Sequence, residues 1–314
     1  MLTHLIILLD DTSVSYCHYN SSSAERNLIS LDDLKEGILF AMKENLNIQF
    51  VYPNYELTLE YDEAIGSIDH TKIKPETYTS DADVIVLLHW KEHILDVVLG
   101  STCIIKASRK ELYDNKEQVK ALLKQVNRLN IMLTDIAEFA DSDIDGYRDW
   151  LNDIAETIID LYRTGKSVQL NLLTDRLLLS EMNNCNAGVN NITLAPNGKF
   201  YLCPAFYYEN PQDSVGDLIS GVVIKNQQLL KLDYAPICRN CDAYQCKRCI
   251  WKNRQLTLDI NTPSHQQCVM AHLERNASRE LLIKLEKNGI ILNNRQKIEE
   301  LNELDPFNIV NRWK

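Results

Sequence analysis

The sequence predicts an α/β fold, in which six parallel strands alternate with helices and are followed by a small cysteine-rich region and C-terminal helices. Two observations predict the first part. Short apolar runs recur along residues 1–182, and amphipathic segments of helical period stand between them. A third observation predicts the second part, because seven of the nine cysteines lie between Cys185 and Cys268. Six strand–helix units are too few to close an eight-stranded barrel, so we expect an open, partial barrel.

Length and charge exclude several classes of protein. The chain has 314 residues, of which 45% are hydrophobic, enough for one large or two modest domains. Its formal net charge of -11 argues against a nucleic-acid partner, because such proteins carry a basic footprint. No run approaches 18 consecutive apolar residues, so we expect no transmembrane helix and no membrane partner. Residues 1–9 are apolar but lack a basic n-region, which predicts a buried strand in a cytoplasmic protein.

The strands and helices of the first part follow from local signals. The candidate strands are His4–Leu9, Ile48–Tyr52, Val84–Leu88, Cys103–Lys106, Ile131–Thr134 and Val168–Leu172. Apolar stripes at helical spacing predict helices over 31–42, 112–126 and 147–161, the first with Ser30 as its N-cap and the last with Gly165 just beyond its end. A further helix is expected from Thr174 to about Met182. Residues 53–81 have the weakest pattern, with one short helix expected near 57–65.

After Cys185 the sequence no longer alternates apolar strands with amphipathic helices. Ile192–Leu194 and Phe200–Leu202 predict a hairpin around Pro196-Asn197-Gly198. The cysteine-rich part has little apolar content, so we expect it to need metal to offset its ordering cost. Helices are expected again from about Ala277, with one stripe before Gly289 and a second, Ile298, Leu301 and Leu304, before Pro306. We therefore predict domains at 1–182, 183–276 and 277–314.

Seven cysteines are the candidate metal ligands: Cys185, Cys203, Cys238, Cys241, Cys246, Cys249 and Cys268. In a reducing compartment, clustered cysteines favour metal binding over disulfides. Four thiolates hold one tetrahedral zinc ion or one cubane iron–sulfur cluster, so seven suit two centres, one with four protein ligands and one with three. Spacing alone does not separate iron–sulfur from zinc, and the two close pairs, Cys238-x2-Cys241 and Cys246-x2-Cys249, could instead form a four-cysteine zinc knuckle.

The remaining candidate residues have bland interpretations as well as functional ones. Cys17 and Cys103 are typical of small buried residues rather than ligands. His265 and His272 flank Cys268, and a hydrogen-bonded structural histidine is the default for each. Asp10 and Asp11 end the first strand, where functional groups gather in barrels, but a solvated strand end explains them equally well.

The cysteine pattern resembles that of a known domain. The pattern C-x12-G-x4-C is followed by a middle block, Cys238-x2-Cys241-x4-Cys246-x2-Cys249, and then by the lone Cys268. This order is similar to the SPASM domain, which follows the catalytic barrel of radical SAM enzymes that modify ribosomal peptides and carries auxiliary [4Fe-4S] clusters. The family spaces its middle block C-x2-C-x5-C-x3-C, whereas this chain has x4 and x2. The resemblance implies that Cys238, Cys241, Cys246 and Cys268 ligate one cluster. Cys185, Cys203 and Cys249 would hold the other, with an open iron or a non-cysteine ligand.

The catalytic motif of that family is incomplete here. Active members carry C-x3-C-x2-C just after the first strand, and those thiolates hold the SAM-cleaving cluster. Tyr16-Cys17 matches the end of the motif, but Asp10 and Val14 occupy the two earlier cysteine positions. One thiolate cannot hold a cubane cluster. The glycine-rich motif expected after the second strand is also missing from 50–56, so the chain resembles a pseudo-radical-SAM protein without a SAM site.

Two further stretches narrow the resemblance. CDAYQCKRCIW and NTPSHQQCVMAHLERNASREL are similar to the maturase of the CXXX-repeat peptide system. The resemblance implies maturation of a Cys-rich precursor peptide by a protein that binds the peptide without cleaving SAM, either alone or beside an active radical SAM maturase. Two alternatives stay open: an enzyme that uses its own open-site auxiliary cluster, and a protein- or peptide-binding module stabilised by zinc.

Overall fold

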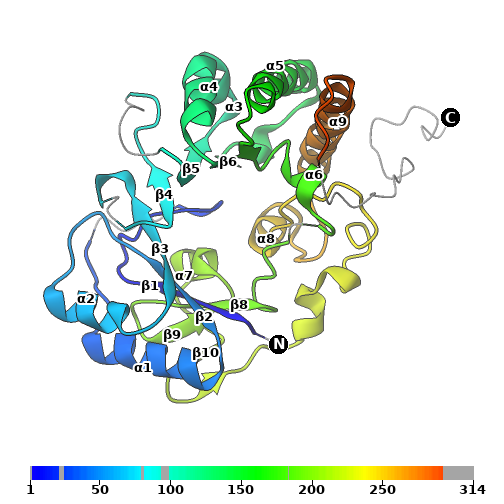
Figure 1. The fold of residues 1–314 in the computed structure, drawn as a ribbon. Helices are drawn as coiled ribbons and strands as arrows, with labels where there is room; N and C mark the ends of the chain where they lie inside the picture. The colour runs from blue at the N-terminus through cyan, green and yellow to red at the C-terminus, as the bar shows by residue number, and fades with distance from the viewer. Residues whose placement is uncertain (1, 21–24, 79–80, 93–98, 183, 293–314) are drawn as a thin grey trace. The chain divides into compact units, whose positions relative to one another are not determined.

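The computed structural model describes residues 2–20, 25–78, 81–92, 99–182 and 184–292 (Figure 1). The chain divides into two compact units. The first consists of Met1–Leu88 and Asn186–Lys231, and the second of His89–Cys185 and Leu232–Lys314. Each unit is therefore assembled from two separate stretches of sequence. Within the described ranges, none of the helices has the length and hydropathy needed to cross a membrane.

The first unit is built on a mixed sheet with the strand order β11-β10-β9-β8-β1-β2-β3-β4. Its strands are β1 His4–Leu8, β2 Asn47–Val51, β3 His70–Pro75, β4 Val84–Leu87, β8 Asn191–Leu194, β9 Lys199–Tyr201, β10 Gly216–Asp217 and β11 Gly221–Val222. Strands β8, β1, β2, β3 and β4 run parallel, and β8 to β11 pair antiparallel. Leu5 lies at the centre of this sheet, paired with Ile48 on one side and Ile192 on the other.

Helices α1 Leu31–Lys43, α2 Leu59–Gly66 and α7 Pro204–Glu209 complete the first unit, with the 3-10 turns η1 Glu76–Tyr78 and η4 Gln227–Leu230. Ser30 caps α1 as predicted, since its hydroxyl accepts a hydrogen bond from the Asp33 N–H at 3.0 Å. The buried face of α1 packs on the sheet, where Leu34 and Ile38 join Phe50 and Leu194 in one apolar core. Gly37 permits this close packing, because a Cβ there would overlap Leu194.

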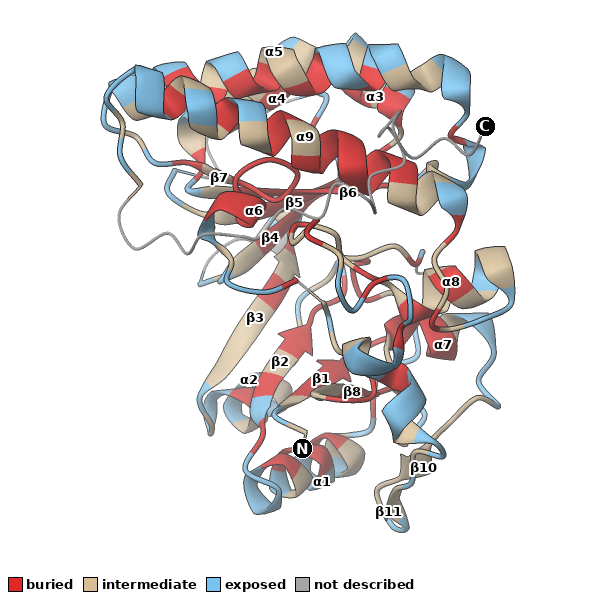
Figure 2. Ribbon diagram, turned by 90° about the vertical axis from the view of Figure 1, so that its right-hand side faces the viewer, coloured by how far each residue is buried: buried red, intermediate tan, exposed pale blue. Residues whose placement is uncertain are grey.

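The second unit contains the parallel strands β5 Thr102–Ala107, β6 Arg128–Leu133 and β7 Gln169–Leu170. Its helices are α3 Arg109–Asp114, α4 Lys116–Gln125, α5 Ile144–Arg163, α6 Asp175–Leu178, α8 Ile250–Thr257 and α9 His265–Lys287, with the 3-10 turns η2 Ile136–Glu138, η3 Asp141–Asp143 and η5 Leu232–Tyr234. Helices α5 and α9 lie side by side with their buried faces turned inward (Figure 2). A buried hydrogen bond of 2.7 Å from Tyr147 to Glu274 joins them.

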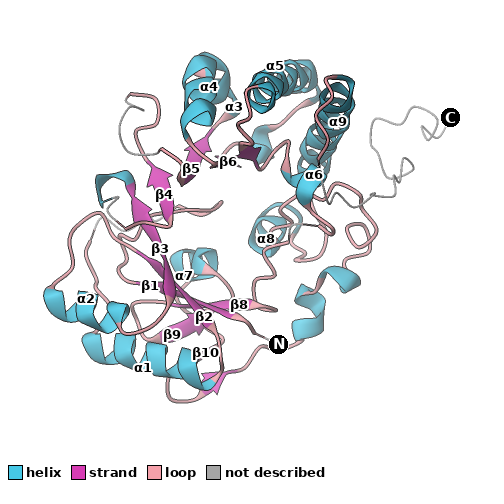
Figure 3. Ribbon diagram, viewed as in Figure 1, coloured by secondary structure: helices cyan, strands magenta, loops and turns pink. Residues whose placement is uncertain are grey.

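The predicted α/β class is confirmed, with strands and helices in alternation (Figure 3). All six candidate strands form, as β1, β2, β4, β5, β6 and β7, and the predicted hairpin is β8–β9. Strand β3 was not expected. Other predictions were wrong in detail: the 112–126 stripe is two helices divided at Asn115, the helix after Thr174 is only α6, and the last helix begins at His265 rather than near 277. The stripe 298–304 lies outside the described residues.

Candidate metal centre

Four of the predicted ligands gather in the second unit. Cys238, Cys241 and Cys246 lie on the loop before α8, and Cys268 is in the first turn of α9. Burial raises the pKa of the Cys246 thiol well above its ordinary value, and Cys241, Cys238 and Cys268 raise it further. Burial also raises the pKa of Cys268 to about 12, with Cys238 and Cys241 adding to it. Burial is thus the main reason why the pKa of both thiols is raised, and other cysteines of the predicted set act in the same direction.

Four thiols are the kind of donor set that a soft metal would need. Among the described residues, no three Cys, His, Asp or Glu side chains are drawn together as tightly as a single bound metal ion requires. A zinc ion holds its sulfurs about 2.3 Å from the metal and hence roughly 3.8 Å from one another. A cubane cluster is larger and spaces its four thiolates over its corners. Four thiols without a carboxylate fit an iron–sulfur cluster or zinc, and each thiol must lose its proton on binding.

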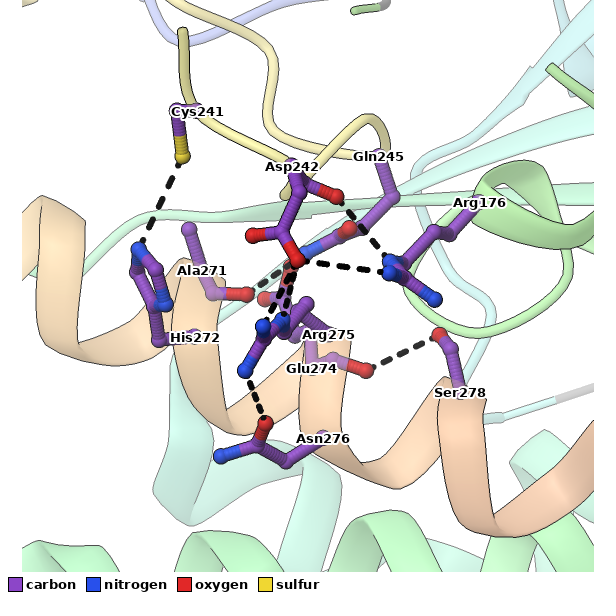
Figure 4. A network of polar contacts seen from close by, with 10 residues as sticks. All are labelled: Arg176, Cys241, Asp242, Gln245, Ala271, His272, Glu274, Arg275, Asn276 and Ser278. Atoms are coloured by element: carbon purple, nitrogen blue, oxygen red, sulfur yellow. Dashed lines mark hydrogen bonds and ion pairs between the residues drawn. The ribbon is translucent and has the colours of Figure 1, made fainter. Parts of the chain in front are cut away.

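Helix α9 holds the cysteine loop through buried polar contacts (Figure 4). Asp242, the residue after Cys241, accepts two hydrogen bonds on Oδ2 from Arg275, from Nε at 3.0 Å and from Nη2 at 2.6 Å. Arg176 of α6 donates from Nε to the Asp242 backbone oxygen at 3.0 Å. Gln245, the residue before Cys246, donates to the Ala271 backbone oxygen at 2.6 Å. Two cysteines of the loop are thus fixed in place by their neighbours.

The buried charges beside the thiols are mostly positive. Asp242 is 2% exposed, and its two arginine partners, Arg176 and Arg275, are 3% and 0% exposed. Arg248 is buried as well and donates to Asn261 Oδ1 at 2.6 Å. Burial lowers the pKa of Arg248, while the nearby cysteines Cys238, Cys185, Cys249 and Cys246 act in the opposite direction. This surplus of guanidinium groups suits a set of anionic thiolates.

His272 lies against one of the thiols. Its Nε2 is 3.6 Å from Cys241 Sγ, and the side chain is buried (Figure 4). His272 follows Cys268 by four residues, so both side chains project from the same face of α9. The sequence contained this signal in the Cys-x3-His spacing, but it was interpreted as a structural histidine. Asp242, Gln245, Arg176 and Arg275 were missed altogether.

The other predicted centre is divided between the two units. Cys185 and Cys249 belong to the second unit, where Cys185 is exposed and Cys249 is half-buried at the start of α8. Cys203 belongs to the first unit, at the start of α7, and is half-buried. The grouping of these three as one ligand set stays a prediction.

Asp10 and Val14 stabilise the loop after β1 through hydrogen bonds. Asp10 is fully buried, which excludes the solvated strand end. Its Oδ1 accepts from the Thr12 N–H and its Oδ2 from the Tyr55 hydroxyl, both at 2.8 Å. Val14 is also buried, and its N–H donates to the Tyr52 backbone oxygen at 2.9 Å. With Cys17 as the only thiol among the three positions, the residues of this loop do not fit a SAM-cleaving cluster.

The neighbourhood of this loop is aromatic. Tyr19 stacks on Tyr208 with ring centroids 5.4 Å apart, and Tyr207 donates from its hydroxyl to Asp11 Oδ1 at 2.5 Å. Burial raises the pKa of Tyr19 well above its ordinary value, with smaller contributions from neighbours that include Cys17 and Cys203. Cys17 is half-buried, whereas Cys103 is fully buried as expected, and burial raises the pKa of its thiol to about 12.

Comparison with solved structures identifies the fold. No family model matches the sequence, and no curated protein sequence matches it. A structure of anSMEcpe with bound AdoMet is similar over 93% of this chain and 97% of that chain, with a TM-score of 0.62 and 14% sequence identity. This chain shares the fold of anSMEcpe. A second structure, of anSMEcpe with bound AdoMet and Cp18Cys peptide, covers 92% of this chain and 100% of that chain, with a TM-score of 0.60 and 12% identity. The predicted fold class is thereby confirmed.

Proposed function

We propose that this protein takes part in the maturation of a Cys-rich precursor peptide, as a peptide-binding protein that carries [4Fe-4S] clusters and does not cleave SAM. One observation supports the proposal: buried polar contacts hold the loop that carries Cys238, Cys241 and Cys246 on α9, which carries Cys268, within a fold shared with a protein that binds AdoMet and a peptide. Fold likeness alone is a weak warrant for function, so the proposal depends on the site.

The four thiols would hold the first cluster and Cys185, Cys203 and Cys249 the second, with one iron left open for a non-cysteine ligand. Bound clusters would supply one-electron transfer and, at the open iron, a Lewis-acidic position. The chain's own contribution is to fix the thiols through Asp242 and Gln245 and to balance their charge with Arg176, Arg248 and Arg275.

Iron, sulfide and zinc assays on anaerobically purified protein test the cluster proposal. We expect about eight irons per chain if both centres are cubanes. Cys241→Ala should lose about half of that iron, whereas Cys103→Ala should keep it, because Cys103 is a buried thiol outside both sets. Stoichiometric zinc without sulfide would contradict the iron–sulfur proposal and favour a module stabilised by zinc.

The absence of SAM cleavage is tested by incubating the protein with SAM and dithionite. Because Asp10 and Val14 stand in the positions of two required thiolates, we expect no 5′-deoxyadenosine above a blank. Protein-dependent production of 5′-deoxyadenosine would contradict this part of the proposal and would make the chain a SAM-cleaving enzyme.

Peptide binding is tested by calorimetry with synthetic peptides that contain repeated Cys-x3 units. We expect micromolar affinity, about -8 kcal/mol, because a disordered peptide must be ordered on binding. A scrambled peptide of equal composition without the repeat is the control. No difference between the two peptides, with or without an active radical SAM maturase present, would overturn the peptide-maturation proposal.

A further inference from the structure

We propose that His272 donates a hydrogen bond from Nε2 to the Cys241 thiolate and thereby raises the reduction potential of the centre held by Cys238, Cys241, Cys246 and Cys268. The inference rests on the proposed binding of an iron–sulfur cluster by these four cysteines. It assigns to His272 a positioning and tuning role, distinct from that of a metal ligand.

The contact that carries the proposal is 3.6 Å between His272 Nε2 and Cys241 Sγ, with the histidine 3% exposed (Figure 4). Cys268 precedes His272 by one helical turn, so α9 presents a ligand and the imidazole to the same centre. Burial removes competing water from the contact, and a hydrogen bond in such surroundings is electrostatically stronger than the same bond in water.

The chemistry of the thiolate fixes the direction of this bond. A free thiol can donate or accept, but a thiolate bound to metal can only accept. Nε2 must therefore carry the hydrogen when the centre is loaded. Hydrogen bonds to the ligand sulfurs are among the factors that set the potential of a cluster. Reduction adds one electron and leaves the sulfurs more negative, so an N–H donor stabilises the reduced state more than the oxidised state.

The surrounding contacts fix α9 against the cysteine loop on both sides of His272. Ala271, immediately before His272, accepts a hydrogen bond from Gln245, and Arg275, three residues after it, binds Asp242. Both partners lie on the same loop as Cys241, one directly next to it. His272 thus lies between two contacts that join α9 to the cysteine loop, and a residue held in this way beside a ligand sulfur can orient the ligand and tune the metal.

The experiment compares His272→Leu and His272→Gln in anaerobically reconstituted protein. Dithionite supplies one electron per cluster, and the midpoint potential is followed by the visible absorption and the spin-resonance signal of the reduced cluster. His272→Leu removes the donor, so its potential should be more negative than that of the wild type. His272→Gln keeps an N–H at similar reach and should restore most of the shift. His265→Leu, an exposed histidine on the same helix, should leave the potential unchanged.

Each outcome decides the proposal. Full iron content with a lowered potential in His272→Leu and recovery in His272→Gln supports it. An unchanged potential in His272→Leu overturns it, and so does the loss of four irons from both variants, which would make His272 a ligand. Wild-type protein that takes up zinc but no iron and sulfide overturns the proposed function as well, so the two failures are distinguishable.

Discussion

Arg275 donates two hydrogen bonds to a single carboxylate oxygen of Asp242, and both side chains are buried from solvent. The two residues are 33 positions apart, one on the cysteine loop and the other on α9. Arg176 donates to the backbone of the same aspartate. A buried charge cluster therefore attaches the loop to the helix. From the low apolar content of the cysteine-rich part we expected it to need metal binding to hold it in place.

We expect Asp242→Ala to lower the free energy of unfolding by about 3–5 kcal/mol, because it leaves the charges of Arg176 and Arg275 buried without their partner. Urea unfolding of the metal-free protein measures this. Asp145→Ala is the matched control, since it breaks the exposed pair with Arg148 and should cost less than about 1 kcal/mol. Equal costs for the two variants would show that the buried cluster does not stabilise the loop.

Glu274 should make stability depend on pH. Burial raises its pKa from 4.5 to about 7, while hydrogen bonds from Tyr147 and Gln245 act against the rise. Between pH 4.5 and about 7, the Glu274 carboxyl is therefore protonated in the folded state but ionised in the unfolded state. The resulting stabilisation is complete below about pH 4.5 and is lost as the pH rises to 7, amounting to about 3 kcal/mol.

Unfolding of the metal-free protein at pH 5 and pH 7.5 checks this dependence. Glu274→Gln should reduce the difference in stability between the two pH values, since the amide does not titrate. Glu156→Gln, an exposed residue of α5 that pairs with Lys284, is the control and should retain the wild-type difference. If Glu274→Gln kept the full difference in stability between pH 5 and pH 7.5, the pH dependence would come from another group.

The loop after β1 should depend on Asp10 for its stability. Asp10→Ala removes the acceptor of the Tyr55 hydroxyl and of the Thr12 N–H, so we expect a loss of about 1–3 kcal/mol in the free energy of unfolding. Asp62→Ala, at an exposed position of α2, should change it by less than about 0.5 kcal/mol. A neutral Asp10→Ala would show that the loop does not need this carboxylate.

The N-terminus of α9 offers a test of how the helix supports Cys268. Ser264 and Gln267 form a reciprocal capping box, with hydrogen bonds of 3.2 Å and 2.8 Å. Ser264→Ala should lower the free energy of unfolding by about 1 kcal/mol and speed the loss of iron from the proposed centre to a chelator, because Cys268 directly follows Gln267 in the first turn of α9. Ser67→Ala, at the exposed end of α2, should not change the rate of iron loss. Equal rates of iron loss in the two variants would show that the capping box does not help to hold the proposed centre.

Local signals in the sequence predicted most of the elements but not their contacts. Strand β1 was evident from its apolar run, because the five consecutive residues Leu5 to Leu9 are all buried. Strand β3 was missed because only Ile73 and Pro75 among its six residues are buried, and its conformation depends on parallel pairing with β2 and β4. The start of α9 could have been predicted from the Ser264–Gln267 capping box, but these residues were assigned to the cysteine-rich region instead.

The candidate site divides in the same way. Cys238, Cys241 and Cys246 could be proposed as ligands from their close spacing on one loop, whereas the addition of Cys268 came from the family resemblance, and the set of four stays a prediction. The contacts of Asp242 with Arg176 and Arg275 join residues 66 and 33 positions apart and leave no local pattern. His272 is the intermediate case, since its spacing from Cys268 is readable but its contact with Cys241 depends on the fold.

The discontinuity of the second unit has a consequence for biosynthesis. Helix α5 ends at Arg163, but α9, which packs beside it, is complete only at Lys287, roughly 120 residues later. At about 5–20 residues per second, synthesis of that stretch takes roughly 6–25 seconds. During this interval the nascent chain exposes the face of α5 that α9 will cover, and Cys238, Cys241 and Cys246 emerge before the helix that fixes them. The proposed cluster could therefore be completed only after α9 has been synthesised, because Cys268 and the contacts that hold the cysteine loop lie on that helix.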